Sequence, residues 1–425
     1  MIKIIKKELG GRAQIFDAVQ EKVDVSGVVR EIVEKVKNEG DSALYYYAEK
    51  FDKAKLTSLR VTEEEISEAV ASVEPKFIEI LKSAAENIRI FHEKQKSSGF
   101  EIKKENGIII GQKVIPVDRA GLYVPGGTAA YPSTVLMDAI PAKIAGCGRV
   151  VMVTPPGKDG KVNPVILAAA YVAGVDEIYK VGGAQAVAAL AYGTESVPKT
   201  DKIVGPGNAY VAEAKRQLYG TVSIDMIAGP SEIMVIADGK NRAKDIAADL
   251  LSQAEHDRMA SAVLVTDSEE FAYAVSEELE KQIPMLERSE IARASIDTYG
   301  KIIITNSLEA AVEVANEIAP EHLEICVDEP FKYLEKVRHA GSVFLGRYCP
   351  EALGDYYAGT NHTLPTSGTA RFSSPLSVDD FIKKTSYTYY DQNAIMKAAP
   401  DIALFARKEG LDAHARSAEI RTENE

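Results

Sequence analysis

From residue 119 onward, short apolar segments alternate with alanine-rich stretches, and this alternation constrains the fold more than any other feature of the sequence. The segments RAGLYV, RVVMVT and DKIV have the length and composition of buried strands. The intervening NPVILAAAYVAGV and AYVAEAKRQLYG are long enough for helices. Strands that alternate with helices of about 10 to 15 residues are typical of βαβ units around a parallel sheet. The sequence therefore predicts a doubly wound α/β domain over residues 119–232.

The same alternation continues from EIMVIAD to HLEICV, so we expect a second α/β domain over residues 233–376. Residues 1–118 are predicted to be mainly helical, because apolar residues recur there at spacings of three and four, and we expect them to contribute to the domain that carries the substrate and metal residues. Within this part, Asn106-Gly107 is expected to form a hairpin turn between two short strands. Residues 377–425 are predicted to form a helical tail. The expected fold class is α/β, with two doubly wound parallel-sheet domains and an extended C-terminal tail.

The composition indicates which classes of partner are disfavoured and in which cellular compartment we expect the protein. With 425 residues and 46% hydrophobic content, the chain can bury more than one core. Its net charge of −13 disfavours nucleic acid or an anionic membrane surface as the main partner. We find neither a signal-peptide pattern nor an apolar run of about 18 residues. The three cysteines, an odd number at wide spacing, fit neither a disulfide framework nor a metal cluster. We therefore expect a cytoplasmic protein.

Glycine-rich turns are the first candidates for ligand binding. The dinucleotide fingerprint GxGxxG is missing, but Gly126-Gly127, Gly182-Gly183 and the segment Gly205-Pro206-Gly207-Asn208 each follow a predicted strand and precede a predicted helix. Glycine allows close approach of a phosphate, and the following helix offers free N–H groups. Tight turns without any ligand explain the same pattern equally well.

Two further groups of residues are candidates for metal binding. Gln253 and His256 are three residues apart on a predicted helix, so their side chains lie on one face and could chelate an ion. Asp355 and His362 lie in a glycine-rich segment that could direct both at one point, and carboxylate with imidazole is suitable zinc chemistry. The alternatives are a solvated histidine at a helix end and a turn with a surface histidine.

Glu321 and His322 immediately precede the apolar segment LEICV and are candidates for acid–base chemistry. Adjacent residues at the start of a strand point to different faces, so we do not expect them to bond each other. Both could still border a cleft, where an imidazole with a pKa of about 6.5 suits proton transfer near neutrality. An exposed capping pair is the alternative. His414, near the C-terminus, has no evident role from its surroundings.

Several long segments, in order along the chain, resemble the histidinol dehydrogenase family over essentially the whole sequence. They are GLYVPGGTAAYPSTVLM, VGGAQAVAALAYGT, KIVGPGNAYVAEAK, SIDMIAGPSEIMVIAD, LLSQAEHD, APEHLEI, GDYYAGTNHTLPTSGTARFSSPLSVDDFIKKTS and EGLDAHARSAEIR. The resemblance implies NAD-dependent oxidation of L-histidinol, through a bound aldehyde, to L-histidine with two NAD and one water. It also implies incomplete Rossmann-like domains and a domain-swapped homodimer with exchanged tails.

The resemblance also assigns roles to individual residues. It implies one zinc ion per site, held by Gln253, His256, Asp355 and His414, with His414 completing the site of the other subunit. The implied general acid–base residues are Glu321 and His322. The implied histidinol contacts are Ser231, His362, Glu409, His322 and the zinc ligands. The implied NAD contacts are Tyr123, Gln185 and Asn208.

No cysteine is needed in this scheme, because water rather than a thiolate adds to the aldehyde. Cys147, Cys326 and Cys349 are therefore expected to have packing roles. Tyr357 departs from the family pattern, which has a smaller residue at this position, and could alter the pocket. Two other functions remain open: a dehydrogenase of the same fold that acts on another small alcohol, and a non-catalytic zinc-binding protein.

Overall fold

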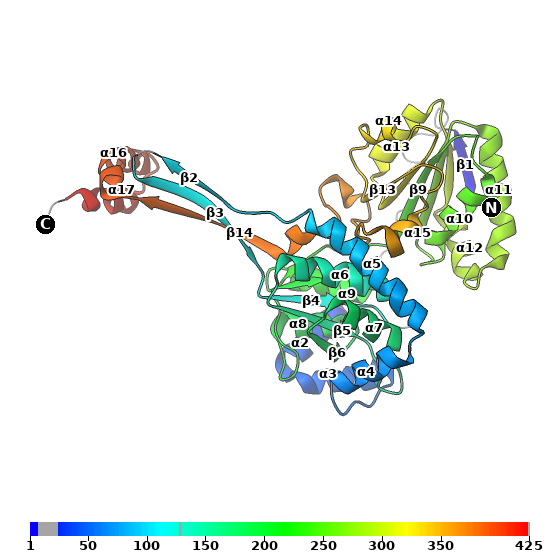
Figure 1. The fold of residues 1–425 in the computed structure, drawn as a ribbon, viewed down its shortest axis with the longest axis horizontal. Helices are drawn as coiled ribbons and strands as arrows, with labels where there is room; N and C mark the ends of the chain where they lie inside the picture. The colour runs from blue at the N-terminus through cyan, green and yellow to red at the C-terminus, as the bar shows by residue number, and fades with distance from the viewer. Residues whose placement is uncertain (7–23, 105, 127–129, 424–425) are drawn as a thin grey trace. The chain divides into compact units, whose positions relative to one another are not determined.

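The computed structural model describes residues 1–6, 24–104, 106–126 and 130–423, which form two compact units (Figure 1). The first unit comprises Met1–Gln95 and Asp118–Phe381, and the second comprises Lys96–Val117 and Ile382–Glu425. Gly127, one of the glycines named above, lies outside the described residues. Both predicted α/β domains therefore belong to the first unit, whereas residues 96–117 group with the C-terminal segment.

The first unit contains a five-stranded parallel sheet, which we call sheet B, in the order β6-β5-β4-β7-β8. Its strands are β4 (Arg119–Tyr123), β5 (Arg149–Thr154), β6 (Glu177–Lys180), β7 (Lys202–Val204) and β8 (Ser223–Ile224). They are connected by helices α6 (Pro132–Ala145), α7 (Pro164–Ala173), α8 (Gly183–Tyr192) and α9 (Ala209–Leu218). The strand order reverses between β4 and β7, which makes their carboxyl ends the topological switch point of a doubly wound sheet.

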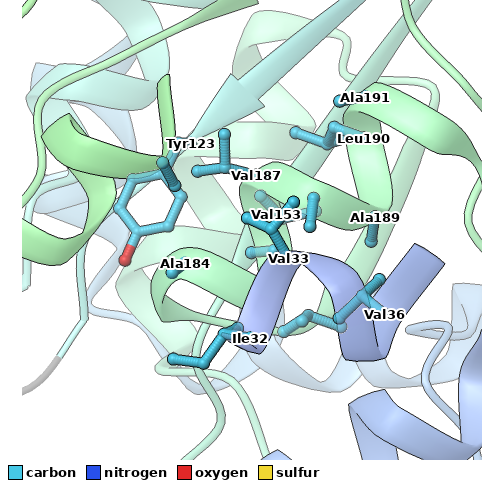
Figure 2. Close-up of a cluster of buried hydrophobic side chains, with 14 of the residues drawn as sticks. Ile32, Val33, Val36, Tyr123, Val153, Ala184, Val187, Ala189, Leu190 and Ala191 are labelled. Atoms are coloured by element: carbon cyan, nitrogen blue, oxygen red, sulfur yellow. The ribbon is translucent and has the colours of Figure 1, made fainter. Parts of the chain in front are cut away.

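One face of sheet B is covered by α8, α9 and the N-terminal helices α2 (Ser26–Glu39) and α3 (Asp41–Tyr47). Helix α2 buries Val29, Ile32, Val33 and Val36, the spacing of a single apolar stripe. Figure 2 shows Ile32, Val33 and Val36 beside Val187 and Leu190 of α8. Full burial of each such side chain contributes about 1.5–3 kcal/mol. The N-terminal amphipathic helices are therefore part of the core.

A second parallel sheet of the first unit, sheet A, has the order β1-β11-β10-β9-β12-β13. Its strands are β1 (Lys3–Lys6), β9 (Glu232–Ala237), β10 (Ser261–Thr266), β11 (Lys301–Ile304), β12 (His322–Cys326) and β13 (Ser342–Leu345). Helices α10 (Ala243–Ala254), α11 (Glu269–Gln282) and α12 (Ser289–Thr298) share a core with one face, and α13 (Leu308–Ile318) and α14 (Phe331–Leu334) with the other. The parallel α/β architecture predicted from the sequence is confirmed, and β1 is an edge strand that was not predicted.

The second unit is built on a three-stranded antiparallel sheet, sheet C, in the order β14-β3-β2. The predicted hairpin is confirmed by β2 (Phe100–Lys104) and β3 (Ile108–Pro116), and Gly107 has the positive φ of 75° that such a turn requires. Strand β14 (Ile382–Tyr390) pairs with β3 along its whole length. Helices α16 (Gln392–Lys408) and α17 (Asp412–Glu419) then pack on each other. The tail is therefore not entirely helical, because its first part pairs with a strand far away in the sequence.

The remaining elements are short helical segments and two longer helices that precede sheet B, interrupt sheet A or follow it in the sequence. They are η1 (Ala48–Asp52), α4 (Glu63–Ser72), α5 (Pro75–Glu93), η2 (Ile283–Met285), α15 (Glu351–Leu353), η3 (Gly354–Ala358), η4 (Thr369–Arg371) and η5 (Val378–Phe381), and the second unit ends with η6 (Ile420–Thr422). Among the described residues, none of the helices has the length and hydropathy needed to cross a bilayer.

Candidate active site

The predicted acid–base residues lie at the amino edge of sheet A. Strands β9 and β12 are neighbours, and their first residues are Glu232 and His322. Helix α10 leaves the carboxyl end of β9 and returns to the start of β10, so its last turn, which contains Gln253, reaches the same edge. The order of the elements thus brings together side chains from positions about 70 residues apart in the sequence.

The environment of His322 determines which of its ring nitrogens is basic. Its Nδ1 lies 3.0 Å from the carbonyl oxygen of Glu232. Because a carbonyl oxygen only accepts hydrogen bonds, Nδ1 carries the proton and Nε2 is the basic atom of the neutral ring. The Glu321 carboxylate is 3.6 Å from Nδ1 and accepts a hydrogen bond from the Glu232 N–H. Glu321 and His322 are therefore close but not hydrogen-bonded to each other, as expected from their positions.

On its other side, His322 faces two carboxylates. Its Nε2 lies 3.5 Å from Asp355 Oδ1 and 3.9 Å from Glu351 Oε1. One possible ligand atom from each of the three residues lies within 4.8 Å of those of the other two. Within the described part of the chain, neither His322 Nε2 nor Glu351 Oε1 has a hydrogen-bond partner, although both atoms are buried. Buried polar atoms without partners are costly, so this convergence indicates a site for a ligand or ion.

Glu351 was not among the predicted residues, although the sequence contained a signal for it. Glu351 and Asp355 are four residues apart, a spacing that places two carboxylates on one helical face, in the run from α15 into η3. The contribution of Glu232 could not have been predicted in this way, because its carbonyl oxygen makes the contact with His322. Every residue type has the same backbone carbonyl oxygen, so a backbone contact across a sheet cannot be predicted from the identity of the residue.

The pKa values at this centre are set by burial and by the mutual influence of the charges. Burial raises the pKa of Glu321 to about 8 and that of Glu351 to about 7, with Asp355 adding to the second shift. Burial alone would lower the pKa of His322, but Glu321 and Asp355 outweigh it and raise that pKa to about 10. Burial alone would also raise the pKa of Asp355, but His322 and His362 hold it well below its usual range. Shifts of this kind are typical of functional sites.

Three of the four predicted zinc ligands lie around this centre. Gln253 is buried at the end of α10 beside Glu351, where it partly offsets the rise that burial causes in the pKa of that carboxyl group. Burial lowers the pKa of His256, and the charge of nearby Asp355 opposes this effect. His414, the fourth, is exposed on α17 in the second unit. Imidazole, amide and carboxylate groups fit a zinc ion, although the convergent atoms belong to His322, Glu351 and Asp355.

The predicted substrate contacts are distributed over both units. Both ring nitrogens of His362 have partners, since Nδ1 is 3.1 Å from the Asp355 carbonyl oxygen and Nε2 is 3.3 Å from Thr134 Oγ1. Ser231 is half-buried immediately before β9, at the same edge as His322. Glu409 is exposed in the second unit, at the end of α16. The assignment of these three residues to a substrate stays a prediction.

The segment that carries Asp355 and His362 is held by two long helices of the first unit. Asn87 of α5 donates a hydrogen bond of 2.7 Å to the Tyr357 carbonyl oxygen, and Asn361 donates one to the Met137 carbonyl oxygen of α6. Gly359 has a positive φ of 101°, and a Cβ there would lie 2.4 Å from the Asn87 carbonyl oxygen. Only glycine fits this approach without displacement. The segment is therefore a supported element rather than an idle connection.

The predicted NAD contacts follow strands of sheet B at its carboxyl edge. Tyr123 is the last residue of β4. Its hydroxyl oxygen accepts a hydrogen bond of 3.0 Å from the Gly183 N–H. Gln185, two residues after Gly183, is buried. Asn208 is exposed and caps α9 by accepting hydrogen bonds from the N–H groups of Tyr210 and Val211. The structure thus brings Tyr123 close to the turn before Gln185, while Asn208 follows β7, the neighbour of β4. The switch point of such a sheet is where nucleotides commonly bind.

Gly205 has a clear reason to be glycine at this edge. Its φ is +112°, and a Cβ would lie 2.1 Å from the Tyr123 carbonyl oxygen. The Gly205 N–H donates a hydrogen bond to Asp225 Oδ2. The buried ammonium group of Lys215 donates to the Gly205 carbonyl oxygen and to Asp225 Oδ1. The turn between β7 and α9 is therefore held by a buried ion pair rather than left free.

The fold and these two edges define a class of protein: an α/β enzyme with two parallel sheets, a buried acid–base centre on one and glycine-rich turns on the other. The family model described as histidinol dehydrogenase matches residues 17–422. The chain belongs to the histidinol dehydrogenase family, and it is accordingly an oxidoreductase. The resemblance inferred from its motifs is confirmed.

Individual members of the family are similar over almost their whole length. The chain is 56% identical to the histidinol dehydrogenase of Clostridium acetobutylicum over 402 residues, which are 95% of this chain and 93% of that protein. It is 58% identical to that of Bacillus cereus over 397 residues, covering 93% and 92%. The crystal structure of histidinol dehydrogenase from Elizabethkingia anophelis matches with a TM-score of 0.93 at 40% identity, covering 99% of this chain and 98% of that one.

Proposed function

We propose that this protein is a zinc-dependent, NAD-linked dehydrogenase that oxidises L-histidinol, through a bound aldehyde, to L-histidine, the last step of histidine biosynthesis. The observation that carries the proposal is the convergence of His322 Nε2 on Asp355 and Glu351, in a chain of the histidinol dehydrogenase family. A buried basic nitrogen with carboxylates on one side is the arrangement that proton removal from an alcohol requires.

The residues that would hold zinc are Asp355, Gln253 and His256, with His414 from the exchanged tail of a second subunit. A zinc ion bound there would anchor the imidazole and amine of histidinol, and its positive charge would offset the carboxylates that otherwise keep His322 protonated. Gln253 and Asp355 both lie beside Glu351, so these ligands are kept close together by buried contacts. A homodimer with exchanged tails is part of this proposal, and Glu409 and His414 would act across its interface.

In the first oxidation, His322 accepts the hydroxyl proton of histidinol at Nε2, and the hydride of the alcohol carbon would go to NAD when it is bound. The Glu232 carbonyl oxygen holds the ring through Nδ1, so Nε2 stays directed toward the carboxylates. Asp355 and Glu351 then stabilise the imidazolium that this transfer creates, because both lie within 4 Å of Nε2. The bound aldehyde is the product of this step.

In the second oxidation, Glu321 removes a proton from the water that adds to the aldehyde, and His322 assists this addition. The pKa of Glu321, raised to about 8 by burial, lies close enough to neutrality for the group to accept and return a proton. The hydrated aldehyde would then give up one hydride to a second NAD, and loss of its two hydroxyl protons to the basic groups of the site and to solvent would leave the carboxylate of histidine. Tyr123, Gln185 and Asn208 would hold NAD at the carboxyl edge of sheet B.

The experiment that tests the proposed function is the yield of NADH per L-histidinol, measured with excess NAD before and after a chelator removes the metal. We expect about two NADH per substrate, since a primary alcohol loses two hydrides on its way to an acid. No free aldehyde should appear, and activity should vanish with the metal and return with zinc. Folded, zinc-loaded protein that forms no NADH would redirect the assignment to another small alcohol.

A second prediction concerns the cysteines. Burial raises the pKa of Cys147 to about 12, and burial with Glu324 raises that of Cys326, so neither thiol forms the thiolate that covalent aldehyde oxidation requires. Cys349 is half-buried. We expect Cys147→Ala and Cys349→Ala to keep wild-type NADH formation from histidinal. Loss of this activity in either folded variant would contradict the addition of water.

A further inference from the structure

Asp138 is a buried acidic residue of α6 that has no part in the mechanism proposed above. It is fully buried, and burial, together with the charge of Asp225, raises its pKa well above the usual range of a carboxyl group. Its Oδ1 accepts a hydrogen bond of 3.0 Å from Thr363 Oγ1. Its Oδ2 is buried and has no hydrogen-bond partner among the residues that the structure describes. The two oxygens therefore have different surroundings.

The bonded oxygen of Asp138 helps to hold the segment that carries His362. Thr134 and Asp138 are four residues apart on α6, a spacing that places both on one face of the helix. Thr134 Oγ1 lies 3.3 Å from His362 Nε2, and Asp138 binds the next residue, Thr363. Asn361, the residue before His362, is also bound to α6, as described above. The position of His362, a predicted histidinol contact, thus depends on α6.

The other oxygen of Asp138 lies beside the glycine-rich turn at the carboxyl edge of sheet B. A Cβ at Gly205 would lie 2.9 Å from Asp138 Oδ2, so the backbone of this turn approaches the carboxyl group closely. Gly205 is the first residue of the Gly-Pro-Gly-Asn segment that ends at Asn208, a predicted NAD contact. Asp138 therefore lies between the segment of a predicted substrate contact and the turn of a predicted cofactor contact.

We propose that Asp138 is a positioning residue that couples the two binding sites, because it connects the segment of His362 to the turn of Asn208. Bound histidinol and bound NAD then each favour the binding of the other. The inference rests on the function proposed above, in which His362 contacts histidinol and Asn208 contacts NAD. The physical reason is that a ligand that immobilises one backbone segment also immobilises the Asp138 carboxyl group. The second ligand then has less of the chain to order and binds more tightly.

The test measures the affinity of the full-length, zinc-loaded protein for NADH by calorimetric titration, without and with saturating L-histidinol. NADH cannot accept a hydride, so the two ligands can be bound together without reaction. We expect histidinol to raise the NADH affinity of the wild type about 5- to 150-fold, the usual range of coupling between two sites. This increase should almost disappear in Asp138→Ala. It should largely persist in Asp138→Asn, which keeps the size of the side chain and an oxygen that can accept the hydrogen bond from Thr363.

The substitution of threonine by valine at two positions provides a matched comparison, because Thr363 and Thr305 are both 6% exposed. Thr363→Val removes the donor to Asp138 and should reduce the coupling as Asp138→Ala does. The double variant Asp138→Ala/Thr363→Val should lose no more, since both changes break the same contact. Thr305 Oγ1 instead donates to the Ser307 carbonyl oxygen, after β11 of sheet A. Thr305→Val should keep the coupling of the wild type.

The possible results separate the inference from the proposed function. A wild type that binds neither NADH nor histidinol would contradict the proposed function, whereas binding of both ligands without coupling would overturn the inference alone. Undiminished coupling in folded Asp138→Ala would also overturn it, because a merely structural role lowers the melting temperature and leaves the coupling factor unchanged. If Asp138→Ala does not fold, Thr363→Val decides the question, and wild-type coupling in that variant would refute the inference.

Discussion

His322→Asn is expected to lower kcat for histidinol oxidation by about a hundredfold to ten-thousandfold, the contribution of a typical general base. The physical reason is that Nε2 is the basic atom of the ring, since Nδ1 donates its proton to the Glu232 carbonyl oxygen. Asparagine can still contact that oxygen but offers no basic nitrogen. Steady-state kinetics with histidinol and NAD measure the loss, and zinc titration should show that the metal still binds.

His339→Asn is the matched control, because His339 lies between α14 and β13 outside the convergent group of His322, Glu351 and Asp355. The same substitution there should leave kcat unchanged. Near-normal turnover in folded, zinc-loaded His322→Asn would remove His322 from the proton-transfer step. A loss of zinc from this variant would instead indicate that His322 is itself a ligand.

Asp225→Asn is expected to destabilise the first unit by roughly 3–5 kcal/mol, because it leaves a buried ammonium group without its counterion. Lys215 and Asp225 are 2.7 Å apart, and their side chains are 2% and 1% exposed. The Asp225 carboxylate also accepts hydrogen bonds from the N–H groups of Gly205 and Met226, so the variant weakens the turn between β7 and α9 as well. Urea unfolding followed by circular dichroism measures the loss as a lower midpoint.

Asp176→Asn provides the comparison for this prediction. Its partner Lys143 is 2.6 Å away, but the two side chains are 36% and 29% exposed, so water can replace the lost partner. We expect a cost of at most about 1 kcal/mol there. Equal unfolding midpoints for the two variants would show that burial of the Lys215–Asp225 pair carries no special penalty.

The sequence was most informative where the evidence is local. The alternation of strands and helices predicted both parallel sheets, because the apolar length of a segment and the periodicity of its neighbours are properties of the chain itself. The spacing of Gln253 and His256 predicted one helix for both residues, and this is correct only for Gln253, because α10 ends at Ala254 and His256 lies in the turn that follows. The turn at Gly107 was predicted from its residue type, since the positive φ suits glycine.

The sequence did not predict the features that depend on contacts between distant segments of the chain. The prediction of a wholly helical tail is wrong for β14, because its pairing with β3 joins residues 266 to 282 positions apart in the sequence. Strand β1 was missed for the same reason, as it becomes a strand only by pairing with β11. Glu351 carried a spacing signal, but a carboxylate four residues before another is common on any helix surface.

By itself, the sequence determined the secondary structure of the α/β part, the family and the residue types available for chemistry, because these depend on local periodicity and on motifs. Only the tertiary structure decided which atoms meet. The Glu232 carbonyl oxygen determines that Nε2 of His322 is basic, and Glu351 and Asp355 converge on that nitrogen. The reason is that parallel strands and the helix between them bring remote residues to one edge of a sheet, and their burial there gives each charge its strength.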